Sequence, residues 1–296
     1  MTTITEKQNP KSRYIDQMET FEILSLINSE DQTVPGIIQM SIPKIKDFVE
    51  EVIVRLENEG RLFYIGSGTS GRLGVLDAVE CVPTFSTPPE MVQGIISGGK
   101  NAMFRSVEGA EDDELQAEQE VINSKIGERD IVLGIAASST TPFVLSSLKM
   151  AKRRNAFTGL LCCNHPDIQP FIDILIPVVV GPEIITGSTR MKAGTATKLI
   201  LNMITTTTMI KLNKTYGNLM VDLKASNKKL VNRGVMLITH FTGLSKSQAL
   251  QLIDECDGEI KTSIVVNKLK ISADEARIRL KSVGGSLRKI IGPAVN

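Results

Sequence analysis

Five short apolar runs, separated by segments with helical periodicity, constrain the fold of this chain more than any other feature. Helix-like segments lie at 70–81, 112–125 and 142–154, and apolar residues also recur at helical spacing over 42–59. The apolar runs have the length of strands and occupy residues 62–66, 92–96, 131–136, 157–162 and 174–180. Strands that alternate with helices pack as a parallel sheet that is covered on both faces. The sequence therefore predicts an α/β fold with a doubly wound, five-stranded parallel sheet.

The segments on either side of this sheet region differ from it. Residues 1–34 are polar and mixed, which indicates an arm with short helices. Residues 245–291 carry apolar positions at helical spacing, broken at Gly258 and near Ser272, which indicates three or four short helices. We therefore expect an N-terminal arm and helix at 1–50, a sheet domain at 51–235 and a small helical C-terminal domain at 236–296.

The composition argues against several classes of protein. The net charge is +1, which leaves no electrostatic footprint for nucleic acid or an anionic membrane. The N-terminus is polar, and no apolar run approaches the length of a membrane span. The cysteines Cys81, Cys162, Cys163 and Cys256 lack metal or redox spacing, which favours reduced thiols. We expect a cytoplasmic protein with no nucleic-acid partner and no membrane segment.

Histidine usage narrows the chemistry further. The only two histidines, His165 and His240, are far apart and distant from any paired cysteines. We interpret His165 as a residue that caps the end of a strand and His240 as a helix residue. A histidine metal site or a Ser-His-Asp triad has almost no material here, so we expect no metal site. In an enzyme of this composition, proton transfers fall to carboxylates, lysines or hydroxyls.

The first candidate site is the turn that follows the apolar run at 62–66. It contains only glycine and hydroxyl residues, from Gly66 to Gly71, and a helix-like stretch follows it. Glycine lets the backbone approach a ligand closely, and the hydroxyls and the free N–H groups of a helix start suit a phosphate. The turn lacks the lysine of a Walker loop and fits the dinucleotide fingerprint poorly. A phosphate site at Ser67, Thr69 and Ser70 and a glycine-rich turn without a ligand explain this stretch equally well.

A second turn of the same kind follows the apolar run at 131–136. Here Ser138, Ser139 and Thr140 precede Pro142, which suits the first turn of a helix. Serine and threonine before a helix are more often N-caps than ligands. Ligands of doubly wound sheets nevertheless bind beyond the carboxyl ends of the strands, where both turns would lie. Two hydroxyl clusters at one edge favour a sugar-phosphate site.

A third loop, Thr186 to Thr195, follows the last apolar run and opens a long helix through Lys211. Arg190 and Lys192 in this loop could hold a carboxylate or a phosphate. The alternative is that both are cations on a solvated helix face. The glycines and hydroxyls around them favour a site.

Two glutamates are candidate acid–base groups. Glu80 follows the first turn in an apolar setting, where burial would raise its pKa and keep it protonated as a general acid. The alternative for Glu80 is a surface carboxylate near a helix end. Glu111 stands in an acidic run at a helix N-terminus, where such residues usually serve the helix dipole. The residues alone do not select Glu111 over its acidic neighbours.

Three long motifs resemble those of N-acetylmuramic acid 6-phosphate etherases. They are GSGTSGRLGVLDAVECVPTF, SVEGAEDD and EIITGSTRMKAGTATKLILNM, and the segment YGNLMVDLKASNKKL is also similar. The likeness covers most of the chain. It implies that the sheet domain has the sugar isomerase (SIS) fold, that the C-terminal domain resembles a ubiquitin-associated (UBA) module, and that the chain forms a homodimer.

The same resemblance implies an activity. Family members cleave the D-lactyl ether of N-acetylmuramate 6-phosphate to N-acetylglucosamine 6-phosphate and D-lactate, with no metal or organic cofactor. In family terms, Glu80 matches the acid that protonates the lactyl oxygen, and Glu111 matches the second catalytic carboxylate, the base at C2.

One departure from the family and two alternative functions accompany this interpretation. The family commonly reads Ala-Ala-Ser-Gly-Arg-Thr-Pro in the second turn, whereas this chain has Ser139 and Thr140 in place of Gly and Arg. The hydroxyl character remains, but a cation is lost.

SIS folds also serve as sugar-phosphate isomerases and as non-catalytic sugar-phosphate sensors. A sensor has no use for the two glutamate motifs, which are intact here.

Overall fold

The computed structural model describes residues 4–225 and 227–293 and divides the chain into two compact units. The first unit comprises Met1–Val79 and Pro89–Thr205, and the second comprises Glu80–Pro88 and Thr206–Asn296. Each unit has its own core and is described by itself. In the described part of the chain, no helix combines the length and the apolar character needed to cross a membrane.

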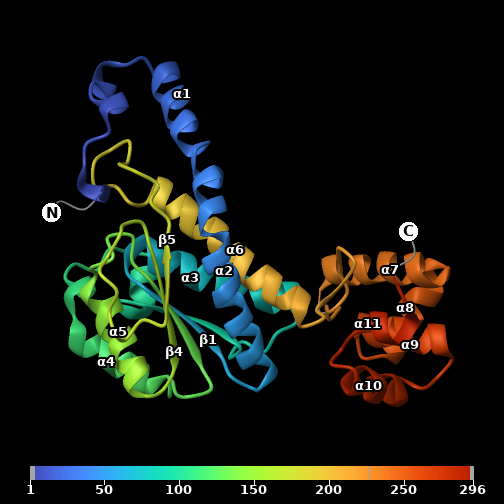
Figure 1. The fold of residues 1–296 in the computed structure, drawn as a ribbon. Coiled ribbons are helices and arrows are strands. Elements are labelled where there is room, and N and C mark those ends of the chain that lie inside the picture. Colours follow the sequence, from blue (N-terminus) through green and yellow to red (C-terminus); the bar gives the residue numbers. More distant parts are fainter. Residues whose placement is uncertain (1–3, 226, 294–296) are drawn as a thin grey trace. The chain divides into compact units, whose positions relative to one another are not determined.

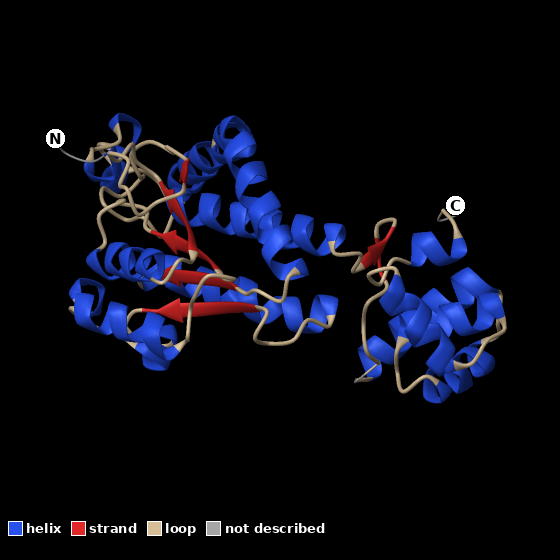
Figure 2. Ribbon diagram, turned by 60° about the horizontal axis from the view of Figure 1, so that its bottom comes forward, coloured by secondary structure: helices blue, strands red, loops and turns tan. Residues whose placement is uncertain are grey.

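A five-stranded parallel sheet forms the centre of the first unit (Figures 1 and 2). Its strands lie in the order β2-β1-β3-β4-β5, and every neighbouring pair is parallel. They are β1 (Leu62–Gly66), β2 (Val92–Ile96), β3 (Ile131–Ile135), β4 (Phe157–Cys162) and β5 (Ile174–Pro177). The predicted doubly wound, five-stranded parallel sheet is therefore confirmed, although β5 ends before the expected residue 180.

Helices cover both faces of this sheet (Figure 1). On one face, α4 (Glu114–Asn123) and α5 (Pro142–Arg153) bury Phe63, Ile65 and Val132. On the other face lie α2 (Val34–Glu57) and α3 (Gly68–Phe85), and a Cβ atom at Gly159 of β4 would lie 2.7 Å from Phe48 of α2. The alternation of side chains along each strand thus supplies an apolar surface to both helical layers.

The arm before the sheet consists of short helical turns. Three 3₁₀ helices lie at Ile4–Glu6, Pro10–Ser12 and Ile15–Gln17, and α1 spans Thr20–Asp31. The helix α2 begins earlier than the expected residue 42 and carries Pro43 in its interior. The last long helix of the region is α6 (Lys192–Lys211).

The second unit is helical apart from a two-stranded hairpin, β6 (Thr215–Tyr216) with β7 (Leu219–Met220). Its helices are α7 (Lys228–Thr242), α8 (Lys246–Glu255), α9 (Ile260–Leu269), α10 (Ala273–Ser282) and α11 (Leu287–Ile291). Gly258 separates α8 from α9, and Ser272 caps α10 through its side chain. The four helices from α8 to α11 confirm the short helices predicted for residues 245–291.

Candidate functional site

The strand order indicates where a ligand would bind, beyond the ends of β1 and β3. In a sheet of order 2-1-3-4-5, the chain leaves these two strands in opposite directions, and ligands bind beyond their carboxyl ends. Gly66, the last residue of β1, is paired in register with Ile135, the last residue of β3. The two hydroxyl turns follow these residues directly, so the structure brings Ser67 and Ser138 to neighbouring strand ends, as predicted.

The first turn requires glycine because its backbone is tightly packed. A Cβ atom at Gly71 would lie 2.5 Å from the carbonyl oxygen of Gly66 and 2.6 Å from Cγ1 of Ile96. Gly68 has a φ of 54°, in the left-handed region, where α3 begins. The turn therefore directs the chain from the buried strand into the helix over very few residues.

The first turn also offers an unused hydroxyl. The Oγ atom of Ser67 is buried and has no hydrogen-bond partner among the described residues. Thr69 and Ser70 are half-buried in the first turn of α3. A buried hydroxyl without a partner is unfavourable unless a ligand or water satisfies it. Ser67 therefore has the character of a ligand-binding residue.

The second turn is held largely by its own polar groups. Ser139 is buried with a φ of 66°, its N–H donates to Ala136 O over 2.8 Å, and its hydroxyl donates to Ser138 O. The N–H of Thr140 donates to Ser138 Oγ over 3.3 Å, and Thr140 itself is exposed. Ser139 thus shapes the turn in a conformation that favours glycine. Ser138 and Thr140 present the remaining hydroxyls.

Asn164 holds the second turn in place through hydrogen bonds, a role that was not predicted from the sequence. Its Nδ2 donates to Ala137 O over 2.9 Å, and its Oδ1 accepts the N–H of Ile4 over 2.7 Å. The side chain is buried at the end of β4. An asparagine directly after an apolar run was the only signal for this role in the sequence.

A cavity of about 660 Å³ opens beside the second turn, on the side of β4. Its wall includes Ser139, Thr140, Asn164, His165 and Lys7. His165 follows the end of β4, as interpreted from the sequence, and His240 lies in α7. The cavity therefore lies against the second turn.

Glu111 lies at the same edge of the sheet as the two turns. It occupies a 3₁₀ helix, Ala110–Asp112, that follows Gly109 and leaves the carboxylate exposed. The preceding segment packs at the end of β2, since a Cβ atom at Gly98 would lie 3.2 Å from Cβ of Ala110. Because β2 neighbours β1, Glu111 belongs to the loops around the first turn.

Glu80 differs from its expected environment. It lies further along α3, in the second unit, and its side chain is exposed. Leu76 and Val79 on the same helix are also exposed. The expected burial of Glu80 is therefore wrong for the single chain: Ala78 and Cys81 face the core, whereas Leu76, Val79 and the Glu80 carboxylate face solvent.

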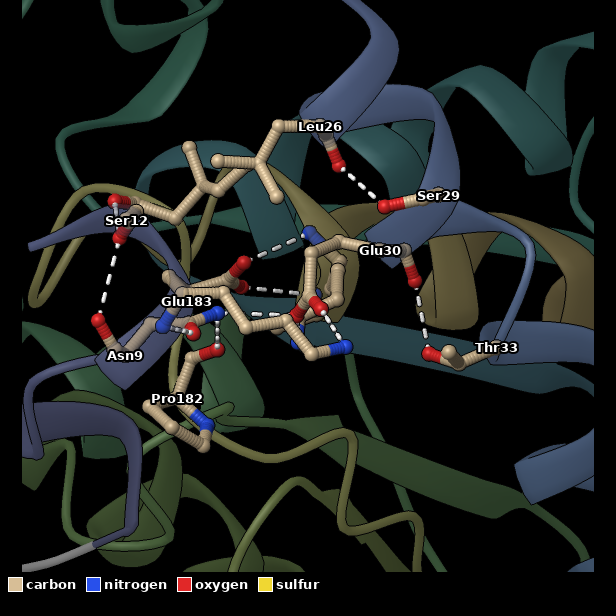
Figure 3. Close-up of polar contacts among 12 residues, drawn as sticks. Asn9, Ser12, Leu26, Ser29, Glu30, Thr33, Pro182 and Glu183 are labelled. Atoms are coloured by element: carbon tan, nitrogen blue, oxygen red, sulfur yellow. Dashed lines mark hydrogen bonds and ion pairs between the residues drawn. The ribbon is translucent and has the colours of Figure 1, made fainter. Parts of the chain in front are cut away.

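The two cations of the third loop have different environments. Arg190 is exposed just before α6. Lys192 is buried, and its Nζ lies 2.7 Å from Oε2 of Glu30, so it is not the solvated cation that the sequence suggested as an alternative. Figure 3 shows Glu30 and Glu183 in the polar cluster around this ion pair. Neither glutamate was predicted from the sequence, although Glu183 stands alone after an apolar run, which is a signal for a buried carboxylate.

Burial and hydrogen bonding oppose each other in this polar cluster. Burial raises the pKa of Glu183, although N–H donors of Ala193 and Lys192 partly offset it. Burial alone would also raise the pKa of Glu30, but hydrogen bonds from Lys11, Lys192 and Asn9 lower that pKa to about 2. Glu30 is therefore ionised near neutral pH and matches the charge of Lys192.

Comparison with known proteins places the chain in a family. Residues 44–152 match the family model described as the glucokinase regulatory protein N-terminal SIS domain. An N-acetylmuramic acid 6-phosphate etherase from Rhodopirellula baltica is 47% identical over 97% of this chain and 95% of its own length. Etherases of the same name from Cutibacterium acnes and Rhizobium rhizogenes are 49% and 48% identical, over 96% and 97% of this chain and 94% of each relative. The sheet domain therefore has the SIS fold, and the chain belongs to the N-acetylmuramic acid 6-phosphate etherase family.

Proposed function

We propose that this protein cleaves the D-lactyl ether of N-acetylmuramic acid 6-phosphate, giving N-acetylglucosamine 6-phosphate and D-lactate. The observation that carries this proposal is identity of 44–49% to etherases over nearly the whole chain. Both glutamate motifs lie within the matched length. The protein is accordingly a carbon–oxygen lyase that acts on a sugar phosphate.

The phosphate of this substrate would bind beyond the ends of β1 and β3. Ser67 supports this placement most directly, because its buried hydroxyl lacks a partner among the described residues. Thr69, Ser70, Ser138 and Thr140 would add hydroxyl donors, and the N-termini of α3 and α5 would add free N–H groups and favourable dipoles. Ser139 would contribute by shaping the turn, and the exposed Arg190 would supply a cation.

The reaction would proceed by elimination and then hydration. In the open-chain aldehyde, Glu111 would remove the C2 proton, and the released electron pair would form a C2–C3 double bond as the C3–oxygen bond breaks. Glu80 would protonate the departing lactyl oxygen. Water would then add at C3, and the proton would return to C2. This route involves no change of oxidation state overall and requires only an acid and a base.

A second copy of the chain is the proposed partner. Apolar side chains on α1 and α2 are strongly exposed in the single chain: Phe21 by 80%, Leu24 by 62% and Met40 by 77%. An apolar surface of this kind is typical of a subunit interface. Cover of α3 by a second copy would also shield the exposed Glu80 side chain from water. Sedimentation of the wild type and of a Phe21→Ser/Leu24→Ser variant tests this proposal.

The same proposal includes two further points. The protein lies in the cytoplasm, and the chain divides at residues 50 and 235 into an arm, a SIS domain and a UBA-like domain. Limited proteolysis with mass analysis of the fragments checks the boundaries. Cleavage confined to other positions would contradict them. Fractionation of the native cells checks the location.

Incubation with N-acetylmuramic acid 6-phosphate and an enzymatic assay for D-lactate tests the activity. We expect stoichiometric D-lactate and N-acetylglucosamine 6-phosphate. The match to the glucokinase regulatory protein SIS model keeps one alternative, a sugar-phosphate sensor. Binding without any conversion would favour the sensor, and conversion of a sugar phosphate without lactate release would favour an isomerase.

A further inference from the structure

Lys192 is enclosed in an ion pair that leaves its ammonium group little room for a ligand. Its Nζ lies 2.7 Å from Oε2 of Glu30, and the two side chains are only 5% and 7% exposed. The same carboxylate accepts hydrogen bonds from Asn9 Nδ2 over 2.9 Å and from Lys11 Nζ over 2.8 Å. The charge of Lys192 is therefore matched inside the protein, on a segment far away in the sequence.

A second buried carboxylate occupies the start of α6. Glu183 is fully buried, and its two oxygens accept the N–H groups of Lys192 and Ala193, each over 2.9 Å. An anion at a helix N-terminus satisfies its free donors and its dipole. The first two N–H groups of α6 are therefore already satisfied by Glu183 and are not available to a substrate phosphate.

These contacts connect the two ends of the loop between Glu183 and Lys192, and hydrogen bonds from the N-terminal arm also hold this loop (Figure 3). Ser12 Oγ donates to Ile184 O over 2.6 Å, and Asn9 Nδ2 reaches Pro182 O over 3.4 Å. The N–H of Gly187 donates to Thr5 O over 3.3 Å. The loop that carries Arg190 is thus held at both ends and in the middle.

The start of α6, which follows the held loop, lies beside the first hydroxyl turn. A Cβ atom at Gly194, in the first turn of α6, would lie 3.5 Å from Cγ2 of Thr69 and 3.6 Å from Thr189 O. Any displacement of the start of α6 would therefore be transmitted to Thr69 and to the residues next to Arg190.

We propose that Glu30, Lys192 and Glu183 are positioning residues, which hold the Arg190 loop against the first hydroxyl turn, and that Lys192 does not itself touch the substrate. This inference rests on the proposed function and changes the role of Lys192 from a substrate ligand to a support. The phosphate-facing cation of the loop is then Arg190.

A double-mutant cycle separates support from direct contact. Glu30→Gln leaves the buried ammonium of Lys192 without its ion-pair partner, and Lys192→Met leaves the buried Glu30 carboxylate with only Lys11 and Asn9. Each variant should therefore lower the melting temperature and raise KM more than it lowers kcat. A displacement of about 1 Å near a site lowers kcat/KM by on the order of a hundredfold. The double variant removes both charges together, and we expect melting temperature and KM to return most of the way to wild type.

Controls make each outcome decisive. Glu50→Gln/Lys46→Met removes an ion pair of 2.9 Å with 63% and 59% exposed side chains, and should leave both KM and melting temperature unchanged. If Lys192 binds the substrate, KM of the double variant will stay as high as that of Lys192→Met even where the melting temperature recovers, and the proposal is overturned. Unchanged melting temperature and KM in both single variants would also overturn it. Release of D-lactate by the wild type tests the proposed function separately.

Discussion

Acid should destabilise the first unit through Glu30. Burial by itself would raise the pKa of this carboxyl, but the hydrogen bonds from Lys11, Lys192 and Asn9 lower it from 4.5 to about 2. A carboxyl with a lower pKa in the folded chain stabilises the fold above its unfolded pKa, and this contribution is lost as the pH falls from 4.5 towards 2. At about 1.4 kcal/mol per pKa unit, the contribution at neutral pH is about 3 kcal/mol.

Comparison of the wild type with Glu30→Gln isolates this contribution. Other groups titrate in both proteins and cancel in the difference. Removal of one partner of a buried ion pair costs about 3–5 kcal/mol, so the free energy of unfolding of the variant should be lower by about that amount at pH 7. The difference should shrink steadily below pH 4.5, because the Glu30 carboxyl of the unfolded wild type then takes up a proton while that of the folded chain stays ionised, which favours the unfolded state.

Urea unfolding at a series of pH values from 7 to 3, followed by circular dichroism, measures the difference. Glu50→Gln, which alters an exposed ion pair, should show a difference below about 1 kcal/mol throughout. A Glu30→Gln difference that stays constant down to pH 3 would refute the reasoning, because Glu30 would then titrate outside the range set by its ion pair.

Three further predictions concern the site. Glu111→Ala should lose both D-lactate release and exchange of the C2 proton with solvent deuterium, whereas Glu80→Ala should lose only lactate release. Each loss should be on the order of a hundred- to ten-thousandfold in rate. Proton NMR in D₂O measures the exchange, and the opposite pattern would mean that Glu80 is the base and Glu111 the acid. Ser67→Ala should mainly raise KM, by the roughly 1.5–3 kcal/mol of a hydrogen bond to a charged group, and unchanged KM in both Ser67→Ala and Ser138→Ala would place the phosphate elsewhere. Thr140→Arg, which restores the cation common in the family, should lower KM in the lactate assay, and an increase would show that the cation is not compatible with this turn.

The sheet could be predicted because each strand carries its own local signal. The runs at 62–66 and 92–96 are apolar, short and bounded by turn residues, and they match β1 and β2 residue for residue. The start of α2 was missed because Pro43 usually marks the beginning of a helix rather than its interior. Periodicity therefore located the elements more reliably than their ends.

The sequence could predict only those parts of the site that depend on residues adjacent to one another in the chain. The hydroxyl turns follow their strands directly, so their place at the sheet edge follows from strand order alone. The partner of Lys192 could not be found in this way, because Glu30 lies 162 residues away and α1 carries no sign of a buried acid. The exposure of Glu80 could not be predicted from the sequence either, because apolar neighbours in the sequence indicate either a core position or a surface that another chain covers.

The contacts of the arm also have a consequence for the order of folding. Ile4, Thr5 and Ser12 bond to Asn164, Gly187 and Ile184, which are synthesised much later than the arm. The sheet strands β1 to β3 can pair before these partners exist, but the arm has no binding place until β4 and the loop before α6 have been made. The arm would therefore dock only after the loop before α6 has been made, when the strands of the sheet are already present.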